Sequence, residues 1–326
     1  MHALAFFDAK PYDGQWFDAF KEELEIRYFE VKLSAHTAPL AAGCRAVCCF
    51  VNDDVGEDTL RALKQIGVEL IALRCAGYNH VAIGAAQKLG LRVVRVPAYS
   101  AHAVAEHALA LLLTLNRKTH KAYNRTRDFN FSLNGLTGFD LYGKVMGVIG
   151  TGLIGRAFAR IALGLGMRVI GYDPYPNSEL GIEYLPLDEL LRQSDVISLH
   201  CPLTADTRHM IDARAFSLIK KGAILINTSR GELIESRALL TALEQGHLGG
   251  AALDVYEEEA GLFFEDNSSR LIHDDVLSLL VTKPNVIVTS HQAFLTHEAL
   301  QAIAQQTLEN VQNFYNGKAL NNEVLP

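Results

Sequence analysis

The chain of 326 residues is long enough for about two domains, and its hydrophobic fraction of 49% is ample for two buried cores. A net charge of −7, a pI near 5.9 and scattered basic residues argue against a nucleic-acid-binding protein, which needs a basic face to meet phosphates. The longest apolar run, 108–115, is far shorter than the roughly 20 residues that cross a bilayer.

The N-terminus has no cationic start and meets Asp8 early, so we do not expect a signal peptide. The five cysteines form an odd set without a C-x-x-C pair, which is typical of small buried hydrophobic residues in a reducing compartment. These features predict a cytoplasmic globular protein, and no metal-binding pattern is identified.

The first hundred residues alternate short apolar runs with amphipathic segments. Strands are predicted at 3–8, 25–31, 46–51, 70–75 and 91–97, and helices that end in glycine at 57–67 and 80–90. Alternation of strands and helices predicts an α/β fold with a doubly wound parallel sheet. A long helix is expected next, at 100–127, with Ser100 as its N-cap.

The second half of the chain continues this alternation. Two strands are predicted within 145–177, the second of them ending in Asp173, and four more at 195–201, 223–229, 249–255 and 285–291, which makes the six of a full dinucleotide-binding sheet. A last helix is expected at 296–316, packed back on the first domain. The predicted organisation is therefore a Rossmann domain at 100–292, inserted into a discontinuous substrate domain at 1–99 and 293–326.

The stretch "VMGVIGTGLIGRAFARIALGLGMRVIGYDPYPN" holds a glycine pattern at the end of a strand. Gly150 permits a tight turn, Gly152 lets the backbone approach a pyrophosphate, and Gly155 lets the helix pack closely on the strand. A turn between packed elements is the simpler alternative. Asp173 argues against it, because a carboxylate that ends the next strand can accept both ribose hydroxyls and would repel a 2′-phosphate. The predicted cofactor is NAD.

Three further segments place chemistry-bearing side chains at the carboxyl ends of strands, where open parallel sheets bind ligands. Arg230 follows one strand and could grip a carboxylate with two parallel hydrogen bonds. Asp254 ends the next strand and precedes three glutamates, and His291 ends the last. Each could equally be a solvated loop residue, but together they supply a carboxylate clamp, a proton donor and an acid that orients it.

At these segments the sequence resembles the D-isomer-specific 2-hydroxyacid dehydrogenases, and within them the D-lactate dehydrogenases, over essentially its whole length. The segments are the glycine stretch above, "HCPLTADTRHMI", "NTSRGELI", "ALDVYEEE", "GLFFED" and "TSHQAF". The resemblance implies a flavodoxin-like substrate domain and a catalytic set in which Arg230 binds the substrate, His291 donates a proton and Glu259, rather than Glu257 or Glu258, is the acid.

The resemblance also implies contacts to cofactor and substrate. The implied cofactor contacts beyond the glycines are Leu153, Ile154, Asp173, Cys201, Pro202, Thr207, Thr228, Ser229, Arg230 and Asp254. For the substrate, backbone amides around Ala76 and Gly77 would hold the carboxylate, Tyr99 would lie at a cleft between the domains, and Phe294 could wall off a pocket for a short side chain.

The implied reaction is the reversible, NADH-dependent reduction of pyruvate to D-lactate. A larger 2-keto acid such as phenylpyruvate or a branched-chain acid is an alternative, since one or two methylenes change binding by only ~1–3 kcal/mol. A second alternative is a protein that senses NAD without turnover. The resemblance also suggests that the helix at 100–127 contributes to the interface of a homodimer or homotetramer, whereas simple packing under the nucleotide sheet is the other explanation.

Overall fold

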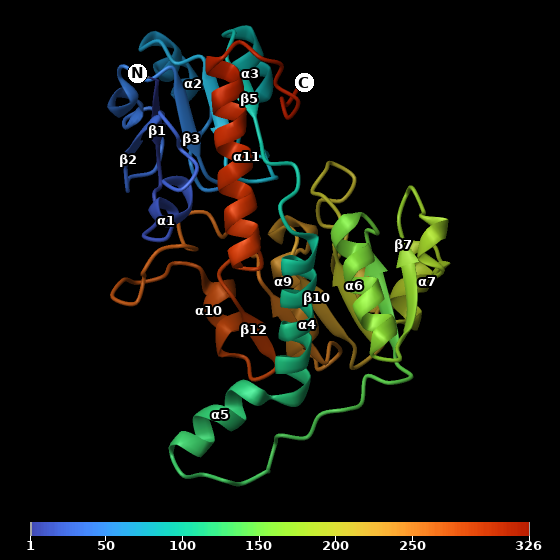
Figure 1. Ribbon diagram of the computed structural model, residues 1–326. Coiled ribbons are helices and arrows are strands. Elements are labelled where there is room, and N and C mark those ends of the chain that lie inside the picture. The colour runs from blue at the N-terminus through green and yellow to red at the C-terminus, as the bar shows by residue number, and fades with distance from the viewer. Residues whose placement is uncertain (1, 326) are drawn as a thin grey trace. The chain divides into compact units, whose positions relative to one another are not determined.

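The computed structural model describes residues 2–325, which form two compact units (Figure 1). One unit is formed by the residues up to Ser100 together with those from Leu295 onward, and the other by Ala101–Phe294. Each unit has its own parallel sheet. Within the described residues, no helix is long and apolar enough to span a membrane.

The first unit contains a five-stranded sheet in the order β2-β1-β3-β4-β5, which is the flavodoxin-like order. Its strands, all parallel, are β1 (Ala3–Phe6), β2 (Glu25–Tyr28), β3 (Ala46–Cys49), β4 (Leu70–Leu73) and β5 (Arg92–Val94). Its helices are α1 (Asp13–Phe17), α2 (Glu57–Gln65), α3 (Ile83–Lys88) and α11 (His297–Tyr315), with a 3-10 turn, η1 (Ala38–Ala41). Helix α11 packs against α1 and β4, so the end of the chain completes this unit.

The second unit contains seven parallel strands in the order β12-β11-β10-β9-β6-β7-β8. They are β6 (Val145–Ile149), β7 (Arg168–Tyr172), β8 (Glu183–Tyr184), β9 (Val196–Leu199), β10 (Ile224–Asn227), β11 (Gly250–Leu253) and β12 (Val286–Val288). Its helices are α4 (Ala101–Arg117), α5 (Thr119–Arg127), α6 (Leu153–Gly164), α7 (Leu187–Gln193), α8 (Ala213–Leu218), α9 (Ser236–Glu244) and α10 (Asp275–Thr282), with 3-10 turns η2 (Ser178–Leu180) and η3 (Gly231–Leu233).

Two parallel sheets with helices confirm the predicted α/β class, and the strand order is that of a Rossmann sheet extended by one strand. The prediction of six strands was wrong by one. The strand it missed, β8, has only two residues at an edge of the sheet and an exposed Glu183, so it leaves no apolar run in the sequence.

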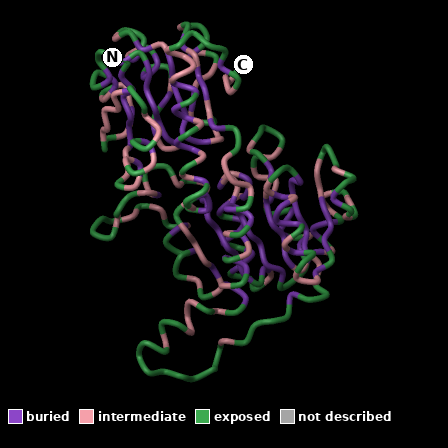
Figure 2. The backbone as a smooth tube through the Cα atoms, in the orientation of Figure 1, coloured by how far each residue is buried: buried purple, intermediate pink, exposed green. Residues whose placement is uncertain are grey.

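The single helix predicted at 100–127 was also wrong, because the chain breaks into α4 and α5 at Lys118. Lys118 has a left-handed backbone (φ 51°), and its side chain donates to the carbonyl of Thr137. The buried Asn116 side chain bonds both the N–H and the carbonyl of Phe139, at 2.9 and 2.7 Å. These contacts tie the segment after α5 back to the end of α4, although the segment itself is exposed (Figure 2).

The apolar face of α4 is buried in the second unit. Leu111, Leu112 and Leu115 belong to the same core cluster as Met146 and Val148 of β6. Helix α6 packs beside α4 and adds Phe158 to this cluster. The helix therefore covers one face of the nucleotide sheet.

A buried arginine organises the carboxyl end of the first sheet. Arg74, which follows β4 and precedes the 75–77 loop, is 3% exposed, and its guanidinium carbon lies 4.4 and 4.7 Å from the ring centroids of Phe6 and Phe50. Its guanidinium donates to the carbonyls of Phe7 and Asp8 at 3.0 and 2.7 Å. This arginine therefore ties the end of β4 to the segment that follows β1.

Two buried carboxyl groups lie close to this guanidinium. Asp53 accepts from the N–H groups of Leu33 and Phe50, both at 2.6 Å, and Asp13 lies 3.8 Å from Arg74. Burial raises the pKa of Asp53 to about 6 and also raises that of Asp13, although the positive charge of Arg74 opposes both shifts.

We predict that Arg74→Met lowers the free energy of unfolding by about 3–5 kcal/mol at pH 8, because it leaves buried carboxylates uncompensated. The loss should be smaller at pH 5. Arg74 stabilises the ionised carboxylates, and that contribution disappears as the pH falls through their folded-state pKa values, near 6 for Asp53. Urea unfolding of the parent and the variant at both pH values measures this loss in free energy of unfolding. Arg61→Met, which removes an exposed ion pair to Glu57, is the control and should cost less than about 1 kcal/mol. Equal losses at both pH values would contradict the assignment.

Candidate active site

The three glycines after β6 differ in what surrounds them. Gly150 has a left-handed backbone (φ 88°), and a Cβ there would lie 2.6 Å from the N atom of Cys201. At Gly155 a Cβ would lie 1.9 Å from the carbonyl oxygen of Gly150. Gly152, the N-cap of α6, has nothing within 4 Å of the same position. The first and third glycines are thus required by packing, and the second leaves open space at the N-terminus of a helix, where a phosphate binds well.

Asp173, at the end of β7, lies against this turn. Its Oδ2 accepts from the N–H and the hydroxyl of Thr151 at 2.6 and 2.9 Å, and its Oδ1 accepts from the N–H of Tyr175 at 2.8 Å. The hydroxyl of Tyr184 donates to Thr151 Oγ1 at 3.1 Å. The carboxylate holds the glycine turn and retains lone pairs for further donors. Sequence reasoning missed Thr151 and Tyr184, because neither a Thr between glycines nor a Tyr on a short edge strand indicates a role in holding the glycine turn.

The loop after β9 forms a neutral wall beside the glycine turn. Burial lowers the pKa of His200 to about 3, and its Nε2 lies 2.9 Å from Ser198 Oγ. Burial raises the pKa of Cys201 to about 12, so its thiol is also uncharged. The ring and the thiol therefore place no charge there, and the positive end of α6 is the field that an anion would meet.

The other predicted cofactor residues lie on loops of the same unit. Ser229 Oγ donates to the carbonyl of Cys201 at 2.6 Å, and Thr207 Oγ1 donates to that of Pro202 at 2.7 Å. Thr228 Oγ1 is buried and makes no hydrogen bond within the described residues. A buried hydroxyl without a partner is costly, so this atom fits a site that a ligand completes. Leu153 and Ile154 begin α6, next to the glycine turn.

Arg230 follows β10 and caps η3. Asn227 Nδ2 donates to its carbonyl at 2.7 Å, and its own Nη1 donates to the carbonyl of Ser229 at 2.7 Å. The half-buried guanidinium forms no ion pair with a carboxylate within residues 2–325. Its remaining N–H groups are therefore available to an acid ligand.

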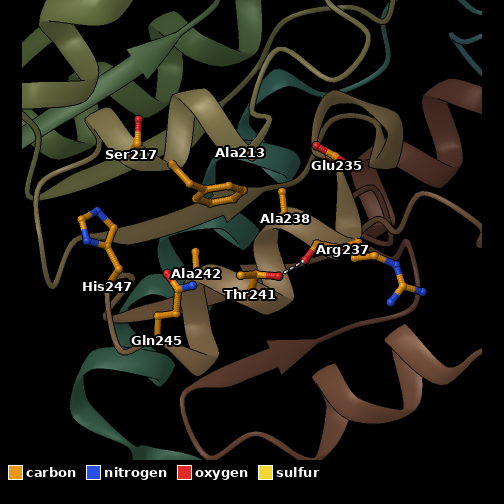
Figure 3. Close-up of a pocket in the computed structure, with 10 residues that line it drawn as sticks. Ala213, Ser217, Glu235, Arg237, Ala238, Thr241, Ala242, Gln245 and His247 are labelled. Atoms are coloured by element: carbon orange, nitrogen blue, oxygen red, sulfur yellow. Dashed lines mark hydrogen bonds between the residues drawn. The ribbon is translucent and has the colours of Figure 1, made fainter.

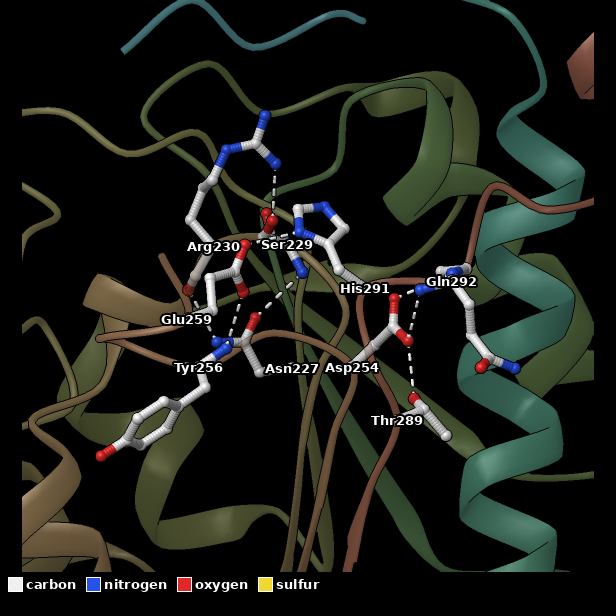
Figure 4. A network of polar contacts seen from close by, with 10 residues as sticks. Asn227, Ser229, Arg230, Asp254, Tyr256, Glu259, Thr289, His291 and Gln292 are labelled. Atoms are coloured by element: carbon white, nitrogen blue, oxygen red, sulfur yellow. Dashed lines mark hydrogen bonds and ion pairs between the residues drawn. The ribbon is translucent and has the colours of Figure 1, made fainter. Parts of the chain in front are cut away.

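Glu259 and His291 form a close pair. His291 Nδ1 donates to Glu259 Oε1 at 2.6 Å, and Glu259 Oε2 accepts from the N–H of Tyr256 at 3.0 Å. Figure 4 shows that Arg230, Glu259 and His291 arrive from three separate loops at one place. Both side chains of the pair are less than one-fifth exposed, and the Phe264 ring lies 5.8 Å from the imidazole. The contact through Nδ1 leaves Nε2 to carry the proton that a substrate would receive.

Glu259 and its two neighbouring glutamates have different contacts in the structure. Glu257 Oε1 pairs with His209 Nε2 at 2.5 Å, and its Oε2 accepts from the N–H of Ser236 at 3.0 Å. Glu258 is exposed. Only Glu259 of the three reaches His291.

Asp254 holds the loop that carries His291. Its carboxylate accepts from Thr289 Oγ1 at 2.6 Å and from the N–H groups of Gln292 and Ala293 at 2.9 and 2.8 Å. Its main-chain carbonyl accepts from the N–H of His291 at 2.6 Å. The contacts show Asp254 as an anchor of this loop, and its predicted contact to the cofactor stays a prediction.

The predicted substrate residues lie in both units. Ala76 and Gly77 follow β4, and Tyr99 follows β5, so all three belong to the first unit. Phe294 is buried at the end of the second unit, three residues after His291. Their roles stay predictions.

A surface pocket of about 550 Å³ lies between α8 and α9 and is unrelated to this set (Figure 3). Its lining includes Phe216, Arg237 and His247 and none of the predicted site residues. The polar groups for chemistry gather at the carboxyl ends of the strands instead.

Comparison with known proteins agrees with this arrangement. The family model described as D-isomer specific 2-hydroxyacid dehydrogenase, NAD binding domain, matches residues 109–293. The D-lactate dehydrogenase of Escherichia coli is 51% identical, with 99% of each chain covered. The chain belongs to the D-isomer specific 2-hydroxyacid dehydrogenases. The predicted family and the predicted cofactor, NAD, are thereby confirmed.

Solved structures of this dehydrogenase family have the same fold. The ligand-free D-lactate dehydrogenase of Escherichia coli matches with a TM-score of 0.90 and 49% identity, covering 99% of this chain and 100% of that one. The pyruvate reductase of Chlamydomonas reinhardtii matches with a TM-score of 0.93 and 42% identity, covering 99% and 98%.

Two alanine substitutions should separate packing from cofactor binding in this dehydrogenase. Gly155→Ala should cost about 3 kcal/mol or more of stability, because its Cβ meets the Gly150 carbonyl. A Cβ at Gly152 meets no protein atom, so Gly152→Ala should have a stability within about 1 kcal/mol of the parent. The same Cβ would occupy the space expected for the pyrophosphate, so NADH binding should be about tenfold weaker. Thermal unfolding and NADH fluorescence titration measure the two effects. Gly164→Ala, on the same helix with open space, is the control and should leave NADH affinity unchanged.

Proposed function

We propose that this enzyme is an NADH-dependent D-lactate dehydrogenase that reduces pyruvate stereospecifically and reversibly. The observation that carries the proposal is the Glu259–His291 pair at 2.6 Å, which lies with Arg230 at the carboxyl edge of an NAD-binding sheet. The relatives described as D-lactate dehydrogenase and pyruvate reductase support this choice of substrate.

In the proposed mechanism, NADH supplies the hydride that C2 of the keto acid receives. Arg230 binds the substrate carboxylate with two parallel N–H groups and thereby orients the C2 carbonyl. Protonated His291 gives the proton on Nε2 to the carbonyl oxygen as C2 gains the hydride, so that the keto group becomes the hydroxyl. Glu259, which accepts from Nδ1, fixes the ring and stabilises the imidazolium before transfer.

The remaining predicted residues complete this proposal. Backbone amides of Ala76 and Gly77 would contribute to binding of the substrate carboxylate, Tyr99 would contact the substrate, and Phe294 would limit its side chain. For the cofactor, the Gly152 turn would hold the pyrophosphate, Asp173 the ribose hydroxyls, and Thr228 Oγ1 would gain the partner it lacks.

The reaction is tested by NADH oxidation with a panel of 2-keto acids, followed by chiral analysis of the product. We expect pyruvate to give the highest kcat/KM and D-lactate as the product. A higher kcat/KM with phenylpyruvate or a branched-chain keto acid would assign the larger substrate. NADH binding without turnover of any member would contradict an enzymatic function.

His291→Ala should lower kcat for pyruvate by about 10²–10⁴-fold, because the alcohol oxygen then loses its proton donor. Glu259→Gln keeps a hydrogen-bonding group but removes the charge that stabilises the imidazolium, so a smaller loss is expected. Steady-state kinetics measure both variants, and the exposed His273→Ala serves as the control. Near-normal turnover by His291→Ala would remove His291 from the mechanism.

We further propose a homo-oligomer in the cytoplasm. Support for assembly comes from large apolar side chains exposed on α5 and the segment after it, namely Tyr123, Phe129, Phe131, Leu133 and Tyr142. Support for a reducing compartment comes from the five cysteines, which are all buried and form no disulfide. A dimer or tetramer mass by light scattering is the expected result, and a monomer mass would exclude the assembly.

A further inference from the structure

The carboxylate of Asp254 is the most deeply buried charge beside the proposed catalytic pair. Asp254 is 0% exposed, and three of its donors, Thr289, Gln292 and Ala293, belong to the loop that carries His291. None of these three is charged. A buried carboxylate needs a positive partner or a dense set of donors to remain ionised.

His107 supplies a fourth donor from a different element. It lies on α4, with Nε2 3.2 Å from Asp254 Oδ1 and 3.3 Å from Thr289 Oγ1. Its side chain is 18% exposed. Burial alone would raise the pKa of Asp254, but hydrogen bonds from His107, Thr289 and Gln292 and the charge of His107 outweigh burial and lower it.

The loop held by Asp254 contains a backbone that is costly to maintain. His291 has φ 53°, a left-handed conformation that non-glycine residues seldom adopt and that persists only where surrounding contacts determine it. Asp254 supplies those contacts on both sides, through its carbonyl to the N–H of His291 and through its carboxylate to the next two N–H groups. The backbone conformation at His291 therefore depends on the position of Asp254 and on the orientation of its carboxylate.

We propose that His107 is a positioning residue that acts through Asp254 to hold His291 in its left-handed backbone conformation. The proposal rests on the proposed function, in which His291 is the proton donor. Within residues 2–325, His107 forms no hydrogen bond or ion pair with Glu259 or His291, so its effect passes through Asp254 and Thr289.

The test compares His107→Leu, which removes the donor, with His107→Gln, which keeps an N–H near the place of Nε2. His107→Leu should lower kcat for pyruvate about tenfold, as expected for loss of a hydrogen bond to a charged group. Its affinity for NADH should fall less than kcat does, since the glycine turn follows β6, which β9 and β10 separate from β11 in the sheet. His107→Gln should recover most of kcat. His102→Leu, an exposed histidine on the same helix, is the control and should match the parent enzyme.

A second readout does not depend on turnover. In enzyme labelled with ¹⁵N-histidine, the imidazole signal of His291, assigned by its loss in His291→Ala, should shift in His107→Leu and stay in place in His107→Gln. An unchanged His291 signal and unchanged kcat in His107→Leu would overturn the proposal. Equal impairment of the Leu and Gln variants would also overturn it, because that result assigns His107 to packing.

The two proposals fail in different ways. A parent enzyme that turns over no keto acid contradicts the proposed function, while the His291 signal still decides whether His107 positions the ring. A parent enzyme that is active, with His107→Leu indistinguishable from it in both readouts, contradicts only the role of His107.

Discussion

The parallel direction of all strands in the second unit is the constraint on which the site depends. Parallel strands deliver their carboxyl ends to one edge, so the loops after β6, β10, β11 and β12 meet there although they are far apart in sequence. The glycine turn, Arg230, Glu259 and His291 each lie on a different one of these loops. An antiparallel strand among them would send its loop to the opposite edge and divide the set.

Much of this arrangement follows from the sequence because it rests on local patterns. Apolar runs of four to five residues and glycines at fixed offsets mark buried parallel strands and the nucleotide turn. The predictions that failed concern an element that is very short and a helix break that depends on contacts between residues distant in sequence. Strand β8 has two residues, too few for a periodic signal. The break at Lys118 depends on contacts with residues about twenty positions later, from Asn116 to Phe139 and from Lys118 to Thr137, which no local window contains.

The proposed catalytic acid, Glu259, shows that the sequence alone cannot separate neighbouring residues of the same type. Three consecutive glutamates, Glu257 to Glu259, have similar intrinsic properties, and the choice of Glu259 came from resemblance to a family. In the structure a turn makes the difference, since the Glu259 carboxylate accepts from the N–H of Tyr256 and the chain folds back between them. That turn directs Glu259 toward His291 and leaves Glu257 to pair with His209. Spacing could not separate them, because adjacent side chains leave a turn in unrelated directions.

The backbone conformations near Glu259 and His291 are maintained by tertiary contacts rather than by the local preferences of the residues. His209, Phe264 and His291 all have φ between 52° and 66°, which is unfavourable for bulky side chains. Two of them belong to the close His–Glu contacts, and the ring of the third faces the imidazole of His291. A conformation that costs of order 1–3 kcal/mol per residue persists only where the surroundings determine it. At His291 the buried Asp254 supplies such contacts to the backbone, and at His209 the N–H donates to the carbonyl of Glu232 while the ring pairs with the half-buried Glu257.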